Sequence, residues 1–256
     1  MIIAVFRLTI FRECIDPEQW QASLYSFDPT PIPLIPVASL KSATVRDPNM
    51  NPPTISVHLL TCAGREASLA ETLASWRACD WGRVCEPEVL VNEEPGENIP
   101  QKVFHGFVRI MRGALAGSAD YFLILEDDIL VARHFRAAVL AWRPFVEGKL
   151  GLAHFYDPCL PVKSTNAAEH YKIGDAFGVF GSQARLFSRE CVEYLLPLYR
   201  VGPEHHDMQT ARLVEMRWPL YMHAPSLVQH TGRESTWGKG PFHFARDFDE
   251  NWHPGA

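Results

Sequence analysis

The sequence of 256 residues lacks the cysteine patterns that mark a structural zinc site. Its six cysteines are scattered, and no two of them form a C-x-x-C pair, so we do not expect a zinc-stabilised fold. Nothing in a chain of this length requires disulfide bonds, and a reducing compartment is the expected setting. The composition therefore argues against a small domain that depends on metal or disulfide cross-links.

Long apolar runs are also missing. The opening segment, residues 1–11, is apolar but short, is interrupted by Arg7 and lacks a small-residue cleavage site. It is interpreted as a strand rather than a signal peptide or a membrane span. No later run is long enough to cross a bilayer. We expect a cytoplasmic protein with no transmembrane segment, for which peripheral contact with a membrane stays open.

Basic residues are not in excess, since 24 Lys and Arg face 30 Asp and Glu and the net charge is −6. A large nucleic-acid footprint is therefore not expected. Repeats and low-complexity tracts are absent as well. With 47% hydrophobic and 21% charged residues, the chain has the composition of a globular protein with a sizeable core. The sequence does not determine an oligomeric state.

The chain divides into a Pro-rich, irregular extension, residues 1–53, and a regular domain, residues 54–256. In the regular domain, strand-like and helical patterns alternate, which predicts a single α/β (Rossmann-like) domain with a mostly parallel central sheet flanked by helices. Strands are expected at 54–61, 88–92, 121–125, 151–156 and 176–182, with a closing segment at 226–232. Helices are expected at 67–79, 101–116, 134–146, 189–198 and 208–217, and an irregular loop at 157–174.

The most informative stretch is 121–131, in which an apolar run leads directly into Glu126, Asp127 and Asp128. The apolar run is typical of a strand buried on both faces of a sheet. Three adjacent acids cannot remain unpaired in such a core, so they are expected at the carboxyl end of the strand, where open α/β sheets bind ligands. Clustered carboxylates favour Mg²⁺ or Mn²⁺. The alternative is an acidic turn that caps the next helix.

A second cluster follows the first strand of the regular domain, at 61–65. Its small residues would let the backbone approach a ligand closely, and Arg65 could contact a phosphate or a base. An ordinary strand-to-helix turn is the alternative. The predicted binding residues in this loop are Thr61, Cys62, Ala63, Gly64 and Arg65.

Two more candidates lie near the ends of later elements. Asp207 precedes a predicted helix and could serve as a general base or as its N-cap. His230 ends an apolar segment and could complete a metal's coordination shell, or be a hydrogen-bonded structural histidine. Because strand ends converge at one edge of a wound sheet, all four clusters are expected to meet there.

Three motifs, in this order, resemble those of nucleotide-sugar-dependent glycosyltransferases of the GT-A fold. Leu125-Glu126-Asp127-Asp128 resembles the E-D-D form of the D-x-D metal motif. Gly181-Ser182-Gln183-Ala184, followed by Phe187-Ser188, resembles the acceptor-side strand and helix. The segment 225–232, followed by Ser235, is similar to the closing segment of the N-acetylglucosaminyltransferase IV group. The resemblance covers roughly residues 54–238.

The resemblance implies a GT-A-like domain with a nucleotide-binding half at about 54–131 and an acceptor half at about 132–256. It implies a hexosyl- or N-acetylhexosaminyltransferase that uses a UDP-sugar, of the kind found in polysaccharide biosynthesis. Asp128 and His230 would bind Mn²⁺ or Mg²⁺, and Asp207 would deprotonate a hydroxyl of a glycan-type acceptor. Glu126 and Asp127 would contact the ribose and sugar, and 61–65 the nucleotide.

A single displacement of this kind inverts the anomeric centre, so an inverting enzyme is expected. In one departure from the family, His205-His206 stands where acidic residues often flank the base.

Three alternatives remain open on the residues alone. A sugar nucleotidyltransferase usually has a long Gly-rich basic loop, which 61–67 does not match. A non-catalytic carbohydrate-binding or scaffold protein on the same fold would not need the acids, the histidine and Asp207 together. A metal-dependent phosphoesterase would cluster more His and Asp ligands. Acceptor specificity is expected at 157–174 and in the aromatic tail at 237–252, and the donor sugar is not determined.

Overall fold

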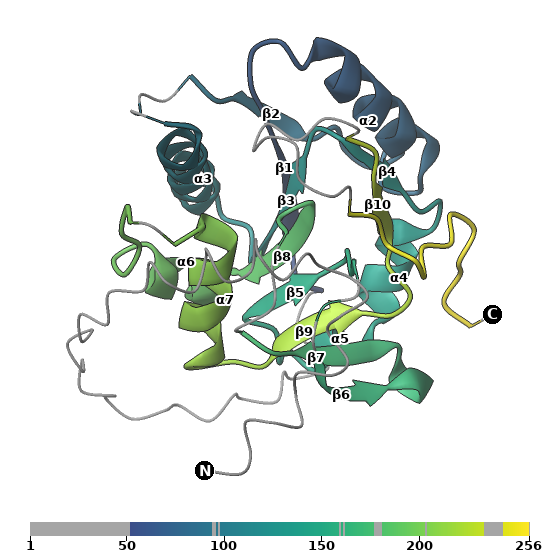
Figure 1. Ribbon diagram of the computed structural model, residues 1–256. Helices are drawn as coiled ribbons and strands as arrows, with labels where there is room; N and C mark the ends of the chain where they lie inside the picture. The colour runs from purple at the N-terminus through teal and green to yellow at the C-terminus, as the bar shows by residue number, and fades with distance from the viewer. Residues whose placement is uncertain are drawn as a thin grey trace.

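The computed structural model describes residues 52–93, 96, 98–158, 160, 162–176, 181–202, 204–232 and 243–255. Most of the Pro-rich extension, the centre of the strand expected at 176–182 and the start of the aromatic tail lie outside these residues. The described residues form an α/β domain around one large sheet (Figure 1).

The large sheet, as far as the described residues show, has eight strands in the order β2-β1-β3-β8-β5-β9-β7-β6. Parallel pairing joins β1 to β2 and β3, and joins β5 to β9, whereas β7 and β8 are antiparallel to their neighbours. All strands except β7 and β8 thus run in one direction, which confirms the predicted, mostly parallel sheet. The strands are β1 (Ile55–Thr61), β2 (Glu88–Val91), β3 (Tyr121–Glu126), β5 (Leu152–His154), β6 (Val162–Asn166), β7 (Tyr171–Gly174), β8 (Ala184–Ser188) and β9 (Leu220–His223).

A second, two-stranded sheet pairs β4 (Ile129–Val131) with β10 (Val228–His230). The pairing is antiparallel and sets His230 opposite Ile129. Because β4 begins directly after Asp128, this small sheet brings the closing segment of the chain next to the acidic motif.

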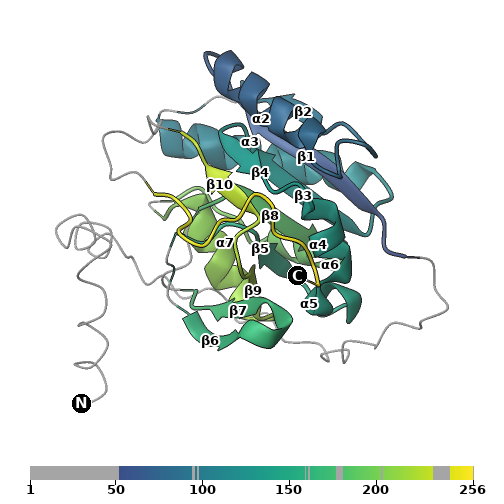
Figure 2. The same ribbon diagram turned by 90° about the vertical axis from the view of Figure 1, so that its right-hand side faces the viewer.

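Helices cover both faces of the large sheet (Figures 1 and 2). The helices are α2 (Glu66–Ala78), α3 (Ile99–Ala116), α4 (Phe135–Ala141), α5 (Arg143–Val146), α6 (Arg189–Leu195) and α7 (His206–Glu215). Residues of α2, α4 and α5 pack into one core, and residues of α3, α6 and α7 into another. On β3, Leu123 and Leu125 face the first core, and Phe122 and Ile124 the second. This strand is therefore buried on both faces, as its unbroken apolar run predicts.

Sequence patterns predict α3 well because its local signals agree. Asn98 is the N-cap, and its side chain accepts a hydrogen bond from the Gln101 backbone N–H at 3.0 Å. Pro100 occupies the first turn, where its missing N–H has no helical partner to lose. Phe107, Ile110 and other apolar residues then line one buried face.

Two predictions about local structure are wrong, and one strand was not predicted. The helix expected over 134–146 is broken at Trp142, which is extended (ψ 124°), because the ring of Pro144 would clash with the carbonyl four residues earlier in a continuous helix. The loop expected over 157–174 contains β6, a short 3-10 turn and β7, which form an antiparallel pair. Strand β9 is absent from the sequence-based prediction, although its four residues are all buried.

None of the described helices combines the length and the apolar character needed to cross a bilayer.

Candidate active site

The three acids lie where β3 leaves the sheet. Glu126 is the last residue of β3, and Asp127 and Asp128 form the turn that leads into β4. Both aspartates are buried, with 4% and 7% of their surface exposed. Buried carboxylates need partners, since leaving each charge unpaired would cost about 3 to 5 kcal/mol.

The loop after β1 supplies these partners. The parallel pairing of β1 with β3 places Leu60 beside Glu126, so the loop that follows β1 begins next to the acids. Thr61 Oγ1 donates a hydrogen bond to Asp127 Oδ2. Arg65 donates from Nε to Asp127 Oδ1 at 2.7 Å and from Nη2 to Asp128 Oδ2 at 2.5 Å. One guanidinium therefore bridges the two aspartates.

The rest of this loop forms a tight turn. Gly64 has φ +85°, a conformation that favours glycine, and its N–H donates to Glu66 Oε1 at 3.0 Å. Cys62 is half-buried, and Ala63 is exposed. Burial raises the pKa of the Cys62 thiol, with the Asp127 charge adding to it. The thiol is therefore kept protonated and is a poor nucleophile here.

His230 also contacts Asp128. Its Nε2 is 3.2 Å from Asp128 Oδ2, across 102 positions of sequence. The Thr231 N–H donates to the Asp128 carbonyl at 2.7 Å, so the closing segment holds both the backbone and the side chain of this aspartate. Burial alone would raise the pKa of Asp128, but the hydrogen bond and charge of His230 and the charge of Arg65 outweigh it and lower that pKa.

Glu126 is in a different state from Asp128. Its Oε1 accepts a hydrogen bond from Ser182 Oγ. Burial, and then the negative charge of Asp128, raise the pKa of Glu126 to about 7. The two neighbouring acids thus have their pKa values moved in opposite directions, a pattern that is frequent at functional sites.

Asp207 lies in the first turn of α7, one residue after the start of the helix. The N-cap position is occupied by His205, so Asp207 is not the N-cap residue. Asp207 Oδ2 accepts from the Gly181 N–H at 2.6 Å, and Oδ1 from the Met208 N–H at 2.9 Å. Burial would raise the pKa of Asp207, but the electrostatic interaction with His206 and the Gly181 hydrogen bond outweigh it and lower that pKa.

The segment Gly181-Ser182 therefore connects two of the predicted groups. Gly181 donates to Asp207, and the adjacent Ser182 donates to Glu126. Gly181 has φ +91°, and a Cβ there would lie 2.6 Å from the Gln183 side chain, so glycine suits this position. The structure thus brings the acidic motif, the 61–65 loop, His230 and, through this segment, Asp207 to one region.

Sequence analysis missed Arg185, at the centre of β8. Its side chain is fully buried, and its guanidinium carbon is 4.4 Å from the centre of the Phe107 ring. Nη2 is 3.3 Å from His206 Nε2, while Nε and Nη1 have no hydrogen-bond partner in the described part of the chain. The available signal was an arginine flanked by apolar residues in the strand Ala184–Ser188.

The residues around Asp128 fit a divalent cation whose remaining ligands are oxygens of phosphate and water rather than protein side chains. Among the described residues, no group of three or more His, Cys, Asp or Glu side chains is placed to hold a metal by itself. However, Asp128 Oδ1 is buried and without a partner there. A Cβ on Gly232 would lie 2.5 Å from Asp128 Oδ2 and 2.8 Å from His230 Nε2. Two protein ligands, with phosphate and water oxygens for the rest, are typical of Mg²⁺ sites.

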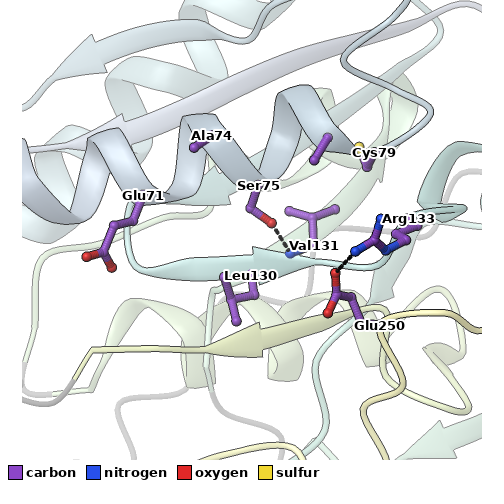
Figure 3. A pocket seen from close by; sticks show the side chains of 9 residues that line it. Glu71, Ala74, Ser75, Cys79, Leu130, Val131, Arg133 and Glu250 are labelled. Atoms are coloured by element: carbon purple, nitrogen blue, oxygen red, sulfur yellow. Dashed lines mark hydrogen bonds and ion pairs between the residues drawn. The ribbon is translucent and has the colours of Figure 1, made fainter.

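A groove of about 370 Å³ lies apart from these residues, between α2, β4 and the C-terminal segment (Figure 3). Ser75 Oγ accepts a hydrogen bond from the Val131 N–H at 2.9 Å beneath it, and Arg133 pairs with Glu250 at 3.0 Å on its rim. None of the predicted site residues lines this groove.

No model of a known protein family matches the sequence, and no curated protein matches it. Among solved structures, a glycosyltransferase involved in the glycosylation of the major capsid of PBCV-1 is 11% identical, with a TM-score of 0.42 over 70% of this chain and 94% of that one. A Drosophila β-1,4-galactosyltransferase 7 mutant in complex with manganese, UDP-Gal and xylobiose is 15% identical, with a TM-score of 0.41 over 70% and 71%.

A CMP:2-keto-3-deoxy-manno-octonic acid synthetase in complex with CTP is 10% identical, with a TM-score of 0.38 over 65% of this chain and 88% of that one. These similarities are too low to assign a family or a function.

Proposed function

We propose that this chain is a divalent-metal-dependent glycosyltransferase with a GT-A-type site, which moves a sugar from a UDP-sugar to a hydroxyl of a glycan-type acceptor. The observation that carries the proposal is the pairing of Asp128 with His230 beside Gly232. Asp128 and His230 are side chains of types that bind metals. One oxygen of Asp128 is buried and has no partner in the described part of the chain, and at Gly232 there is no room for a side chain.

The donor side of the site consists of the acids and the loop after β1. Asp128 and His230 hold Mn²⁺ or Mg²⁺, which when bound stabilises the negative charge that develops on the leaving diphosphate. Glu126 and Asp127 contact the ribose and the sugar. Residues 61–65 contact the nucleotide, and the Arg65 guanidinium already lies against the two aspartates, where it can add a positive charge near the phosphates.

Asp207 is the proposed general base. Its lowered pKa keeps the carboxylate ionised at neutral pH, which is the form that can accept a proton from an acceptor hydroxyl. Two backbone N–H groups fix the orientation of the carboxylate. Attack by the acceptor oxygen at the anomeric carbon, with departure of the nucleoside diphosphate from the opposite face, inverts that carbon.

The first experiment is a calorimetric titration of the full chain with UDP and with GDP, with and without Mn²⁺. It uses wild type, Asp128→Ala and a matched control, Asp249→Ala, which removes an exposed carboxylate. We expect UDP binding that needs the metal, is lost in Asp128→Ala and is unchanged in the control. UDP binding without metal and unaffected by the mutation would retain a nucleotide site but remove the metal role. No nucleotide binding in any condition would refute the proposal.

A second experiment addresses the base. Asp207→Asn keeps an oxygen for one of the two backbone N–H groups but removes the proton acceptor, so turnover should fall by about 10²- to 10⁴-fold while UDP and Mn²⁺ still bind. The anomeric configuration of the product, followed by NMR, distinguishes inversion from retention. Unchanged turnover in this variant would exclude Asp207 as the base.

A further inference from the structure

The C-terminal strap, defined as residues 243–252, runs beside β10 (Figure 2). Its main attachment is the carboxamide of Gln229. Gln229 Nε2 donates to the Ala245 carbonyl at 2.9 Å, and the Ala245 N–H donates to Gln229 Oε1 at 2.8 Å. Ala245 is buried, with 3% of its surface exposed. One side chain thus satisfies both main-chain groups of a buried strap residue, as a paired strand would.

Further contacts hold the strap downstream of Ala245. Asp247 Oδ1 accepts from Ser226 Oγ at 2.6 Å, and Asp247 Oδ2 from Lys172 Nζ at 3.3 Å. The Arg133 N–H donates to the Glu250 carbonyl at 2.8 Å. The strap is therefore fixed along its length, and Gln229 is the attachment nearest to His230.

The strap contacts His230 directly. His230 Nδ1 is 3.1 Å from the His243 carbonyl oxygen. A carbonyl can only accept a hydrogen bond, so Nδ1 must be the nitrogen that carries a proton in this contact. Nε2 is then the nitrogen directed at Asp128, at 3.2 Å from Oδ2. Histidines that bind metals generally donate their other N–H to a carbonyl or carboxylate, which fixes both the tautomer and the ring orientation.

We propose that Gln229 is a positioning residue for the metal site. By holding Ala245 it places the His243 carbonyl against His230 Nδ1, and this contact presents Nε2 to the cation held with Asp128. The inference rests on the proposed function, because it assigns a role to the strap in that same site. In this role Gln229 and the strap contribute the orientation of His230.

A double-mutant cycle tests whether Gln229 acts through His230. Binding of Mn²⁺ in the presence of UDP is measured for wild type, Gln229→Leu, His230→Ala and the double variant, with Glu250→Gln as a control at the far, exposed end of the strap. We expect Gln229→Leu to weaken Mn²⁺ binding by about 10- to 100-fold, and to have little further effect in the His230→Ala background. An equal loss in both backgrounds, or no loss in either, would overturn the proposal.

A second measurement separates this inference from the proposed function. In protein labelled with ¹⁵N-histidine, the His230 Nδ1–H signal is assigned by its absence in His230→Ala. It should be protected from exchange with solvent in wild type and should lose that protection in Gln229→Leu. If wild type binds no Mn²⁺ or UDP but shows this behaviour, the proposed function fails and the positioning of His230 by the strap stands. A signal that is unprotected in wild type, or unaffected by the substitution, overturns the inference. Should Gln229→Leu not fold, Gln229→Met takes its place.

Discussion

Mild acidification should destabilise this protein, because three histidines are buried in neutral form. His154, His206 and His223 have at most 6% of their surface exposed. Burial lowers the pKa of His154 and His206 to about 3, and that of His223 to about 4. Each also has a ring nitrogen without a hydrogen-bond partner in the described part of the chain, so a proton added to that nitrogen would find no acceptor there.

The sign of the effect follows from linkage between protonation and folding. When the folded-state pKa lies below the unfolded value of ~6.5, the unfolded chain binds protons first as the pH falls. The stability due to a buried neutral histidine is therefore complete above pH ~6.5 and is lost between that pH and the folded-state pKa. At pH ~5 each of the three histidines costs about 2 kcal/mol, or about 6 kcal/mol together.

Glu126 opposes this loss. Its pKa is raised to about 7, so the folded state takes up a proton there before the unfolded chain does as the pH falls. This group contributes about 2 kcal/mol of stability at pH ~5 relative to pH ~7.5. For the three buried histidines and Glu126 taken together, a net loss of a few kcal/mol remains, which is a large fraction of the 5 to 15 kcal/mol, roughly, that stabilises a typical domain.

The assay is urea unfolding at pH 7.5 and pH 5 on wild type and His154→Leu. We expect the free energy of unfolding to fall on acidification in wild type, and to fall by about 2 kcal/mol less in His154→Leu. His253→Leu, which changes an exposed histidine, is the control for burial. A wild-type stability that is equal or greater at pH 5, or an identical pH dependence in His154→Leu, would refute the reasoning.

Three further substitutions have defined outcomes. Gly232→Ala places a methyl group 2.5 Å from Asp128 Oδ2, so calorimetry should show at least a ~10-fold loss of metal-dependent UDP binding in a protein that is still folded. Thr72→Val removes the buried hydroxyl that accepts from the Ile129 N–H and donates to the Ile129 carbonyl, both at 3.0 Å, and should lower the free energy of unfolding by about 1 to 3 kcal/mol. Arg185→Met replaces a buried guanidinium whose pKa is lowered by burial, and should raise the free energy of unfolding by about 1 to 3 kcal/mol in chemical denaturation.

The controls for these substitutions come from the same chain. Gly113→Ala adds a methyl group in α3 that, among the described residues, would have no atom within 4 Å other than those of its own helix backbone and chain neighbours, so it should leave UDP binding intact. Thr72→Ser retains the hydroxyl and should recover most of the stability lost in the valine variant. Equal effects of Val and Ser at position 72, or a large loss of stability in Arg185→Met, would contradict the physical reasons given.

The sequence alone was sufficient to predict the elements around the acidic motif. The apolar run of β3, the acids that follow it, and the cap and apolar face of α3 are local patterns, and each is set by residues close together in the chain. The position of Glu126, Asp127 and Asp128 at the carboxyl end of a central strand followed from them, because charges cannot be left unpaired in a core. The catalytic and binding roles assigned to these residues stay predictions.

Edge strands were harder to predict. Val162–Asn166 is mostly exposed and shows no alternation of apolar and polar residues, so its strand conformation depends on pairing with Tyr171–Gly174 rather than on burial. The burial of Arg185 was equally hard to predict, because the residues around it come from α3 and α7 as well as from its own strand.

Only the tertiary structure decided which residues meet. Asp128 and His230 are 102 positions apart, and they come together because β4 pairs with β10 in a register that no local pattern records. The same holds for Arg65 bridging Asp127 and Asp128, and for the strap carbonyl at His230. Local patterns set the conformation of a segment because they act through its own backbone and burial. The partners of a side chain at long range depend on how the whole sheet and its helices pack.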